Sequence, residues 1–265
     1  MSVTGIIIAV SVVGGVGLFI GIFLSVAGNY FRVETNPLVD EIIDALPGNN
    51  CGGCGYAGCN ALAEAIASGD APVSGCPVGG ESVAQNIAGI MGVEADAGEK
   101  KIAHVKCKGT CDLTFSNYNY EGVKDCRMAS FVPAGGPKSC DFGCMGFGTC
   151  MDVCEFDAIN IVDGIAVIDK DKCRACGKCI DVCPKHLIEL IPYKAKYVVE
   201  CMNRDKGPLV MKVCKAGCIG CSLCAKECPK EAVEVTDSLA HIDQDKCVGC
   251  GLCAKKCPKN AITAL

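Results

Sequence analysis

The 265-residue chain has no tryptophan, only three histidines and few aromatic residues, which make up 5% of the sequence. The histidines (His104, His186 and His241) are scattered, so the paired Cys-x-His spacing of a Rieske iron–sulfur site is missing. The sequence also lacks a P-loop and a GxGxxG motif after an expected strand. No serine or cysteine triad can be argued. These absences speak against nucleotide binding and against bond-making chemistry by this chain.

Charge is missing from residues 1–31, where an apolar run extends from Gly5 to Gly28. About 22 helical residues, at about 1.5 Å rise each, would cross the hydrocarbon core of a bilayer. The alternative is a cleaved signal peptide, but a basic n-region and a twin-arginine pair are both absent. We therefore predict a single transmembrane helix over residues 1–30. Arg32 is the nearest basic residue, and it favours a cytoplasmic position for the rest of the chain at the inner membrane.

Basic residues are missing from residues 33–99, which hold ten acidic ones. Residues 100–265 hold 24 basic and 20 acidic residues, so the net charge of −5 hides an acidic segment followed by a mildly basic one. A simple solvated surface is one interpretation. The functional interpretation is that the basic half docks an acidic protein partner, which would speed their encounter. Nucleic acid is not an expected partner.

Cysteine, in contrast, is abundant, with 25 residues. A disulfide framework is a poor explanation, because an odd count leaves a spare thiol and most cysteines fall into tight CxxC runs. Such runs are typical of a metal or an iron–sulfur cluster, since neighbouring sulfurs must converge on one centre. Redox centres in series indicate electron transfer, in a reducing compartment.

An internal repeat of 74 residues organises the second half of the chain. Between the cysteine runs, "AINIVDGIAVIDKDKC" matches "AVEVTDSLAHIDQDKC", and both alternate apolar and polar residues around a turn, which predicts a hairpin. Each repeat should thus contain a cysteine loop, a short helix, a hairpin and a second cysteine loop. The predicted fold class is α+β, with two bacterial-type 2[4Fe–4S] ferredoxin-like modules in tandem.

Three runs fit the C-x2-C-x2-C-x3-C-P motif at every position: "CRACGKCIDVCP", "CIGCSLCAKECP" and "CVGCGLCAKKCP". In this motif three thiolates cap one [4Fe–4S] cluster and the fourth cysteine ligates the neighbouring cluster. Structural zinc is the alternative, but zinc sites usually use two separated cysteine pairs. The predicted ligand sets of the second repeat are Cys218, Cys221, Cys224 and Cys257, and Cys247, Cys250, Cys253 and Cys228.

The opening run of the first repeat, "SCDFGCMGFGTCMDVCEF", departs from the motif. Phe147 stands where a middle ligand belongs, and Glu155 replaces the proline. We predict that Cys140 replaces the missing ligand; a three-ligand cluster is the alternative. The predicted sets of the first repeat are Cys140, Cys144, Cys150 and Cys183, and Cys173, Cys176, Cys179 and Cys154.

A separate unit near the N-terminus carries four cysteines, three of them on a glycine-rich loop whose backbone can approach a ligand closely. They suit one self-contained [4Fe–4S] cluster, with zinc as the alternative. Its predicted ligands are Cys51, Cys54, Cys59 and Cys76.

Five cysteines remain, and they make the number of clusters five or six. Four of them could hold a sixth cluster where the modules meet, or could be buried thiols that act as small apolar side chains. The candidates for this sixth site are Cys107, Cys126, Cys201 and Cys214. Cys111 is left without an assignment.

The expected organisation has five parts. A transmembrane anchor over residues 1–30 is followed by a four-cysteine domain over 31–92 and a connecting segment over 93–135. The two ferredoxin-like modules cover residues 136–195 and 196–265.

The order of an apolar anchor, "LPGNNCGGCGYAGC" and ferredoxin repeats resembles the B subunit of the Rnf-type ion-translocating ferredoxin:NAD oxidoreductase complex. The resemblance implies an electron-transfer subunit of a membrane-bound translocase. It would accept electrons from soluble reduced ferredoxin and pass them to membrane-embedded iron–sulfur and flavin subunits. A membrane-tethered polyferredoxin that serves a hydrogenase or another reductase is the alternative, and a zinc scaffold without a redox role is a third hypothesis.

Overall fold

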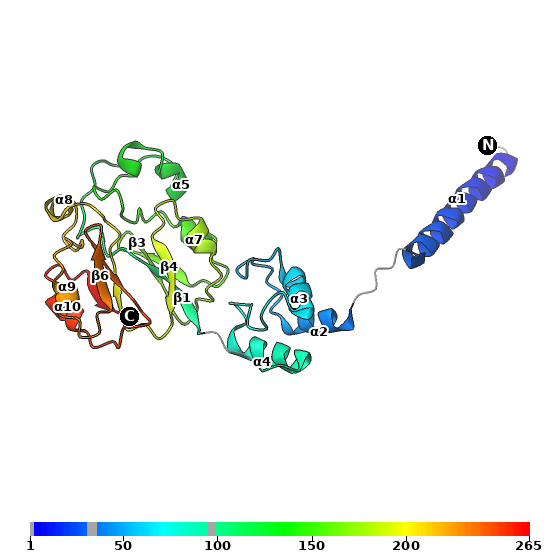
Figure 1. The fold of residues 1–265 in the computed structure, drawn as a ribbon. Coiled ribbons are helices and arrows are strands. Elements are labelled where there is room, and N and C mark those ends of the chain that lie inside the picture. Colours follow the sequence, from blue (N-terminus) through cyan, green and yellow to red (C-terminus); the bar gives the residue numbers. More distant parts are fainter. Residues whose placement is uncertain (1–2, 31–35, 95–98) are drawn as a thin grey trace.

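The computed structural model describes residues 3–30, 36–94 and 99–265 of the chain (Figure 1). Helix α1 (Val3–Tyr30) covers the apolar run, and its side chains are described at residue 7 and over residues 11–27. In the described part of the chain, no helix is long and apolar enough to cross a membrane. The predicted transmembrane helix is therefore not confirmed, and part of it lies outside the described residues.

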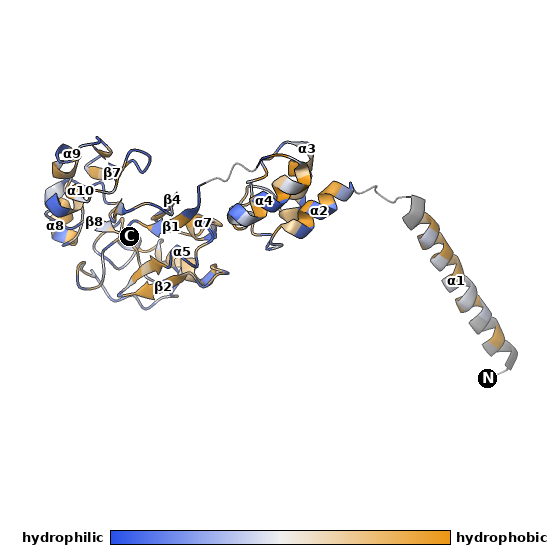
Figure 2. Cartoon of the chain, turned by 90° about the horizontal axis from the view of Figure 1, so that it is seen from below, coloured by the Kyte–Doolittle hydropathy of each residue, from blue (hydrophilic) through white to orange (hydrophobic). Residues whose placement is uncertain are grey.

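Three short helices form the N-terminal unit: α2 (Pro37–Ala45), α3 (Cys59–Ser68) and α4 (Gly80–Met91). Helix α2 begins where the sequence predicts it, because Asn36 caps it by accepting a hydrogen bond from the Leu38 N–H, and a proline occupies its first turn. The apolar faces of the three helices meet around Ile42, Leu62 and Ile87, which are fully buried. Figure 2 colours much of α2 and α3 as hydrophobic. This small core holds the loop that carries Cys51 and Cys54.

The two ferredoxin-like modules share one plan of two antiparallel strand pairs each. In the first, β1 (Lys101–Val105) pairs with β4 (Ile188–Pro192), and β2 (Ile159–Val162) pairs with β3 (Ile165–Ile168). In the second, β5 (Tyr197–Val199) pairs with β8 (Ile262–Ala264), and β6 (Val233–Thr236) pairs with β7 (Leu239–Ile242). The inner pairs are the two hairpins that the alternating sequence pattern predicts. Each module thus closes its first strand on its last.

Short helices follow the cysteine loops. They are α6 (Thr149–Asp152) and α7 (Lys178–Asp181) in the first module, and α9 (Leu223–Lys226) and α10 (Leu252–Lys256) in the second. Each places one cysteine of a run on its buried side: Cys150, Cys179, Cys224 and Cys253. Two separate apolar cores, one in each module, surround these cysteines.

Strand β1 comes from the segment predicted as a connection, because residues 101–105 pair with β4 along their whole length. The rest of that segment forms an excursion between β1 and α6. It contains helix α5 (Cys126–Ala129) and the short 3₁₀ turn η1 (Pro133–Gly135). The equivalent excursion in the second module, between β5 and α9, contains helix α8 (Gly207–Val213). These two excursions carry the cysteines outside the regular motifs.

Candidate iron–sulfur centres

In the second module, the fold brings the last cysteine of one run to the first three of the other. A single cavity is lined by Cys218, Cys221, Cys224 and Cys257. Burial raises the pKa of the Cys224 thiol to about 11, and the neighbouring Cys218, Cys257 and Cys221 sulfurs act in the same direction. This is the crossed grouping that the motif predicts.

The reciprocal set of the second module surrounds Cys253. Burial raises the pKa of its thiol, and the nearby Cys247, Cys228 and Cys250 sulfurs act in the same direction. The sulfur of Cys228 accepts a hydrogen bond from the Ala232 N–H at 3.3 Å, and Cys257 accepts one from the Ala261 N–H at 3.3 Å. Backbone donors of this kind favour the charged form of a sulfur ligand.

In the first module, the regular set gathers around Cys179. Burial raises the pKa of its thiol to about 12, and the Cys173, Cys176 and Cys154 sulfurs act in the same direction. Cys173 accepts hydrogen bonds from the Ala103 and Ala175 N–H groups at 3.3 and 3.5 Å. The structure therefore brings together the four residues that the crossed motif predicts for this centre.

The irregular set of the first module differs from the prediction in one member. One cavity is lined by Cys126, Cys144, Cys150 and Cys183. Burial raises the pKa of Cys150 to about 12, with the Cys144, Cys126 and Cys183 sulfurs next in effect. Cys140, the predicted fourth member, lines a different cavity. The correction has a physical cause, because Cys126 reaches this place from the excursion that follows β1.

The excursion is fastened at the position where the cysteine is missing. The ring of Tyr120 lies on that of Phe147, with centroids 5.2 Å apart and planes tilted by 36°. The Cys126 N–H donates a hydrogen bond to the Thr149 hydroxyl at 2.7 Å. Asp125 caps the short helix α5 by accepting bonds from the N–H groups of its second and third residues. These contacts hold Cys126 at the cavity of the irregular set.

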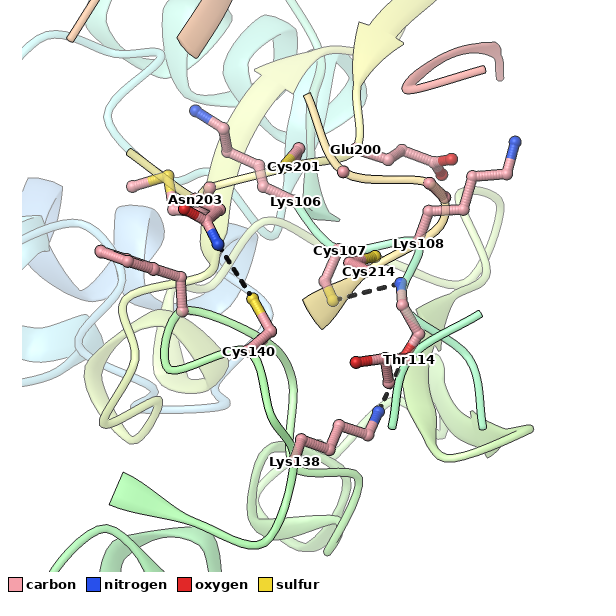
Figure 3. Close-up of a pocket in the computed structure, with 16 residues that line it drawn as sticks. Lys106, Cys107, Lys108, Thr114, Lys138, Cys140, Glu200, Cys201, Asn203 and Cys214 are labelled. Carbon is pink, nitrogen blue, oxygen red and sulfur yellow. Dashed lines mark hydrogen bonds between the residues drawn. The ribbon is translucent and has the colours of Figure 1, made fainter. Parts of the chain in front are cut away.

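Four further cysteines line one cavity between the modules (Figure 3): Cys107, Cys140, Cys201 and Cys214. The set differs from the predicted sixth site by the exchange of Cys126 for Cys140. Cys140 is half-buried, and Cys201 and Cys214 are buried. Burial raises the pKa of the Cys140 thiol, and the nearby Cys107 and Cys214 sulfurs contribute in the same direction.

The N-terminal unit gathers its own four cysteines at the start of α3. Cys54, Cys59 and Cys76 pack against the same small core. Burial raises the pKa of the Cys76 thiol, and the Cys59 and Cys51 sulfurs act in the same direction. Asn50 fixes the loop, because its side-chain oxygen accepts a hydrogen bond from the Cys59 N–H at 2.8 Å. The grouping agrees with the predicted single centre.

The donor sets fit cuboidal clusters. Each consists of four free thiols, held in part by backbone N–H groups that point at sulfur. Among the described residues, no group of three or more His, Cys, Asp or Glu side chains is spaced to hold a single metal ion. Cys111, the remaining cysteine, is exposed, and its N–H donates to the carbonyl of Asp163 at 2.9 Å.

Comparison with known protein families identifies the cluster-binding segments. The family described as "Putative Fe-S cluster" matches residues 46–78. The 4Fe-4S dicluster domain matches residues 172–232, and the 4Fe-4S binding domain matches residues 240–263. Ferredoxin-like 4Fe–4S domains are thus present in a fold of mixed helices and strands, as the sequence predicts.

Curated relatives cover nearly the whole chain. The B subunit of the Na(+)-translocating ferredoxin:NAD(+) oxidoreductase complex of Acetobacterium woodii is 47% identical over 242 residues, which are 91% of this chain and 72% of the relative. The B subunit of the ion-translocating oxidoreductase complex of Methanosarcina acetivorans is 43% identical over 239 residues, 90% of each protein. The chain belongs to the B-subunit family of Rnf-type ion-translocating oxidoreductase complexes. The resemblance seen in the sequence is therefore confirmed.

The same family includes the B subunit of the proton-translocating ferredoxin:NAD(+) oxidoreductase complex of Clostridium ljungdahlii, 42% identical over 231 residues, 86% of this chain and 81% of the relative. Relatives named for different coupling ions are thus similar to this chain to almost the same degree. Membership makes the chain one component of a larger complex, so the other components are its partners.

Proposed function

We propose that the chain is the electron-transfer subunit of an ion-translocating ferredoxin:NAD oxidoreductase. The observation that carries the proposal is the set of four-cysteine groups that runs from the N-terminal unit through both modules. When bound, [4Fe–4S] clusters supply one-electron redox chemistry. The chain's own contribution is to hold the sulfur ligands, shield them and order the centres in space.

Two neighbouring units of the chain approach each other at cysteine ligands. The backbone of Gly53, in the N-terminal cysteine loop, lies so close to Cys176 that a Cβ at Gly53 would be 2.7 Å from the Cys176 carbonyl oxygen. The Cys51 sulfur contributes to the raised pKa of the Cys176 thiol, after burial, which is the main cause. This contact supports a continuous route between the N-terminal centre and the first module.

The second module offers a surface for soluble ferredoxin, the proposed donor. Cys221 and Cys250 are exposed, and so are the apolar side chains of Val248 and Leu252. Lysines surround this end of the molecule: Lys226, Lys230, Lys255 and Lys256. A positive rim with an apolar centre suits an acidic redox partner, because the charge steers the encounter and the apolar patch brings the centres close.

We propose further that residues 1–30 hold the chain at the cytoplasmic membrane, next to membrane-embedded iron–sulfur and flavin subunits. The apolar side chains of α1 are exposed over residues 11–27, for example Leu18 at 67% and Phe19 at 70%. So much exposed apolar surface requires cover by lipid or by membrane subunits. Carbonate washing of membranes tests this: the full chain should stay bound, and a chain that starts at residue 36 should be released.

Reduction by ferredoxin tests the electron-transfer proposal. Anaerobically prepared full-length chain is mixed with reduced ferredoxin, and bleaching of its visible absorbance is followed in a stopped-flow instrument. We expect fast bleaching that slows as salt rises and slows further in the Lys255→Glu/Lys256→Glu variant. The matched control is Lys172→Glu/Lys194→Glu, which reverses the same charge in the first module. Equal rates in both variants, or no bleaching of the wild type, would contradict the proposed docking.

A further inference from the structure

We propose that Cys107, Cys140, Cys201 and Cys214 bind a sixth [4Fe–4S] cluster that joins the two ferredoxin modules. The inference rests on the proposed electron-transfer function, and it adds a centre and a position in the route. The four residues come from separate segments and line one cavity between the modules (Figure 3).

The site has an internal symmetry that follows the repeat. Each module contributes one cysteine two residues after its first strand: Cys107 follows β1, which ends at Val105, and Cys201 follows β5, which ends at Val199. Each also contributes one cysteine four residues before its cysteine run, Cys140 in the first module and Cys214 in the second. Two equivalent pairs facing one another are expected of a shared centre, because each module alone supplies only half of a four-sulfur ligand set.

The sulfur atoms of this site accept hydrogen bonds from several donors. Cys107 accepts from the Gly109 N–H at 3.4 Å and from the Cys144 N–H at 3.3 Å. Cys140 accepts from the side-chain amide of Asn203 at 3.4 Å. Asn203 is 1% exposed, and its side-chain oxygen accepts a hydrogen bond from the N–H two residues further on, at 2.7 Å. A fully buried amide that donates to sulfur is costly to maintain unless the sulfur needs the donor.

Cationic side chains lie beside the same cavity. Lys106 and Lys138 line it, and both are buried, with 7% of their surfaces exposed. The Lys138 ammonium donates to the Gly109 and Gly164 carbonyl oxygens at 2.8 Å, and Lys106 pairs with Glu189 at 3.1 Å. Buried positive charge favours thiolates over thiols, which is the form that a cluster requires.

The position of the site links a centre in each module. The Cys144 N–H that bonds to Cys107 belongs to a residue of the irregular first-module set. On the other side, the Cys218 N–H donates to Cys201 at 3.3 Å, and Cys218 belongs to the set at Cys224. One peptide group therefore separates the proposed cluster from the ligands of its neighbours in both directions. An electron that leaves a second-module centre, which is thereby oxidised, would reduce this centre before the first module.

Iron and zinc counts on the full-length chain, purified anaerobically and reconstituted, test the proposal directly. We expect about 24 iron atoms per chain, as for six clusters of four irons. The Cys140→Ser variant should hold about 20, with EPR signals of the other centres retained. Cys111→Ser is the matched control, since Cys111 is exposed, and it should keep the wild-type count.

Several outcomes would overturn the inference. They are a wild-type count of about 20 iron atoms, one zinc per chain at this site, or a Cys140→Ser variant with undiminished iron. The wild-type count decides even if the variant does not fold. Failure of the wider function is distinguishable: about 24 irons in a chain that ferredoxin cannot reduce would leave the site standing and reject the function. Reduction by ferredoxin with about 20 irons would do the reverse.

Discussion

Phe147 packs on Tyr120, with ring centroids 5.2 Å apart, at the position where a cysteine ligand is missing from the first module. Tyr120 belongs to the excursion that also delivers Cys126 to the cavity lined by Cys150. The same excursion therefore covers the substituted position and supplies a cysteine in its place. A lost ligand and a gained segment are two parts of one change.

This relationship predicts that Cys126 and residue 147 are interchangeable as the source of the fourth thiolate. Cys126→Ser should lose about four iron atoms per chain, or should convert one cluster to a three-iron form visible by EPR. The double variant Cys126→Ser/Phe147→Cys should regain the full count, because it restores the regular spacing of the run. A double variant that remains as depleted as the single one would show that Cys126 is not the replacement ligand.

A second prediction concerns the close approach of a cysteine loop to a hairpin turn. Gly220 has a φ of +65°, and a Cβ there would lie 2.7 Å from the Ser238 carbonyl oxygen. Gly220→Ala should therefore destabilise the second module by roughly 1–3 kcal/mol, from the left-handed backbone and the clash together.

The matched control for this glycine is Gly177, which has a φ of +84° with nothing within 4 Å of the added Cβ. Gly177→Ala should cost only the backbone strain, about 1 kcal/mol. The apparent unfolding temperature, measured anaerobically with clusters bound, reports both changes. Equal losses in the two variants would mean that the close approach adds nothing.

A third prediction concerns pH. His104 is buried in β1 opposite Glu189, and desolvation is the main reason that its pKa is lowered to about 4. Its Nε2 has no hydrogen-bond partner among the described residues. The unfolded chain binds a proton near pH 6.5, which the folded chain resists until about pH 4, so stability falls as pH drops through this window.

The contribution amounts to about 3 kcal/mol at most, at about 1.4 kcal/mol for each unit of pKa. His104→Leu should remove this part of the acid sensitivity, whereas replacement of the exposed His241 by glutamine should leave it in place. Denaturant unfolding of the full chain at about pH 7 and about pH 5, on either side of the unfolded histidine pKa, measures the difference. If His104→Leu lost as much stability between these pH values as the wild type, the explanation would be rejected.

Much of the molecule follows from local sequence patterns. The hairpins at Asp163-Gly164 and Asp237-Ser238 form where the apolar alternation and turn residues predict them. The crossed grouping at Cys224 also follows, because a C-x2-C-x2-C-x3-C-P run constrains its sulfurs through spacing alone. Local spacing is a reliable guide where the ligands lie within one loop.

The exchange between Cys126 and Cys140 could not be derived from spacing, because the decisive contacts are distant in sequence. The 74-residue register places Cys201 next to the equivalent of Cys126. The strand pairs instead make Cys107 the equivalent of Cys201, since each follows the first strand of its module. The stretch from Cys107 to Cys140 is twenty residues longer than that from Cys201 to Cys214, and this extra length contains Cys126. Comparison of these two lengths is the signal in the sequence that identifies it as an inserted ligand.

The central claim is that this chain holds a series of [4Fe–4S] centres for electron transfer. The most direct measurement is EPR of the full-length chain, purified anaerobically and reduced with dithionite, with iron and sulfide counted on the same sample. The account predicts a brown protein that bleaches on reduction, with about 24 irons and about 24 sulfides per chain and interacting signals of reduced [4Fe–4S] clusters. A colourless protein that contains zinc and gives no signal on reduction would contradict it.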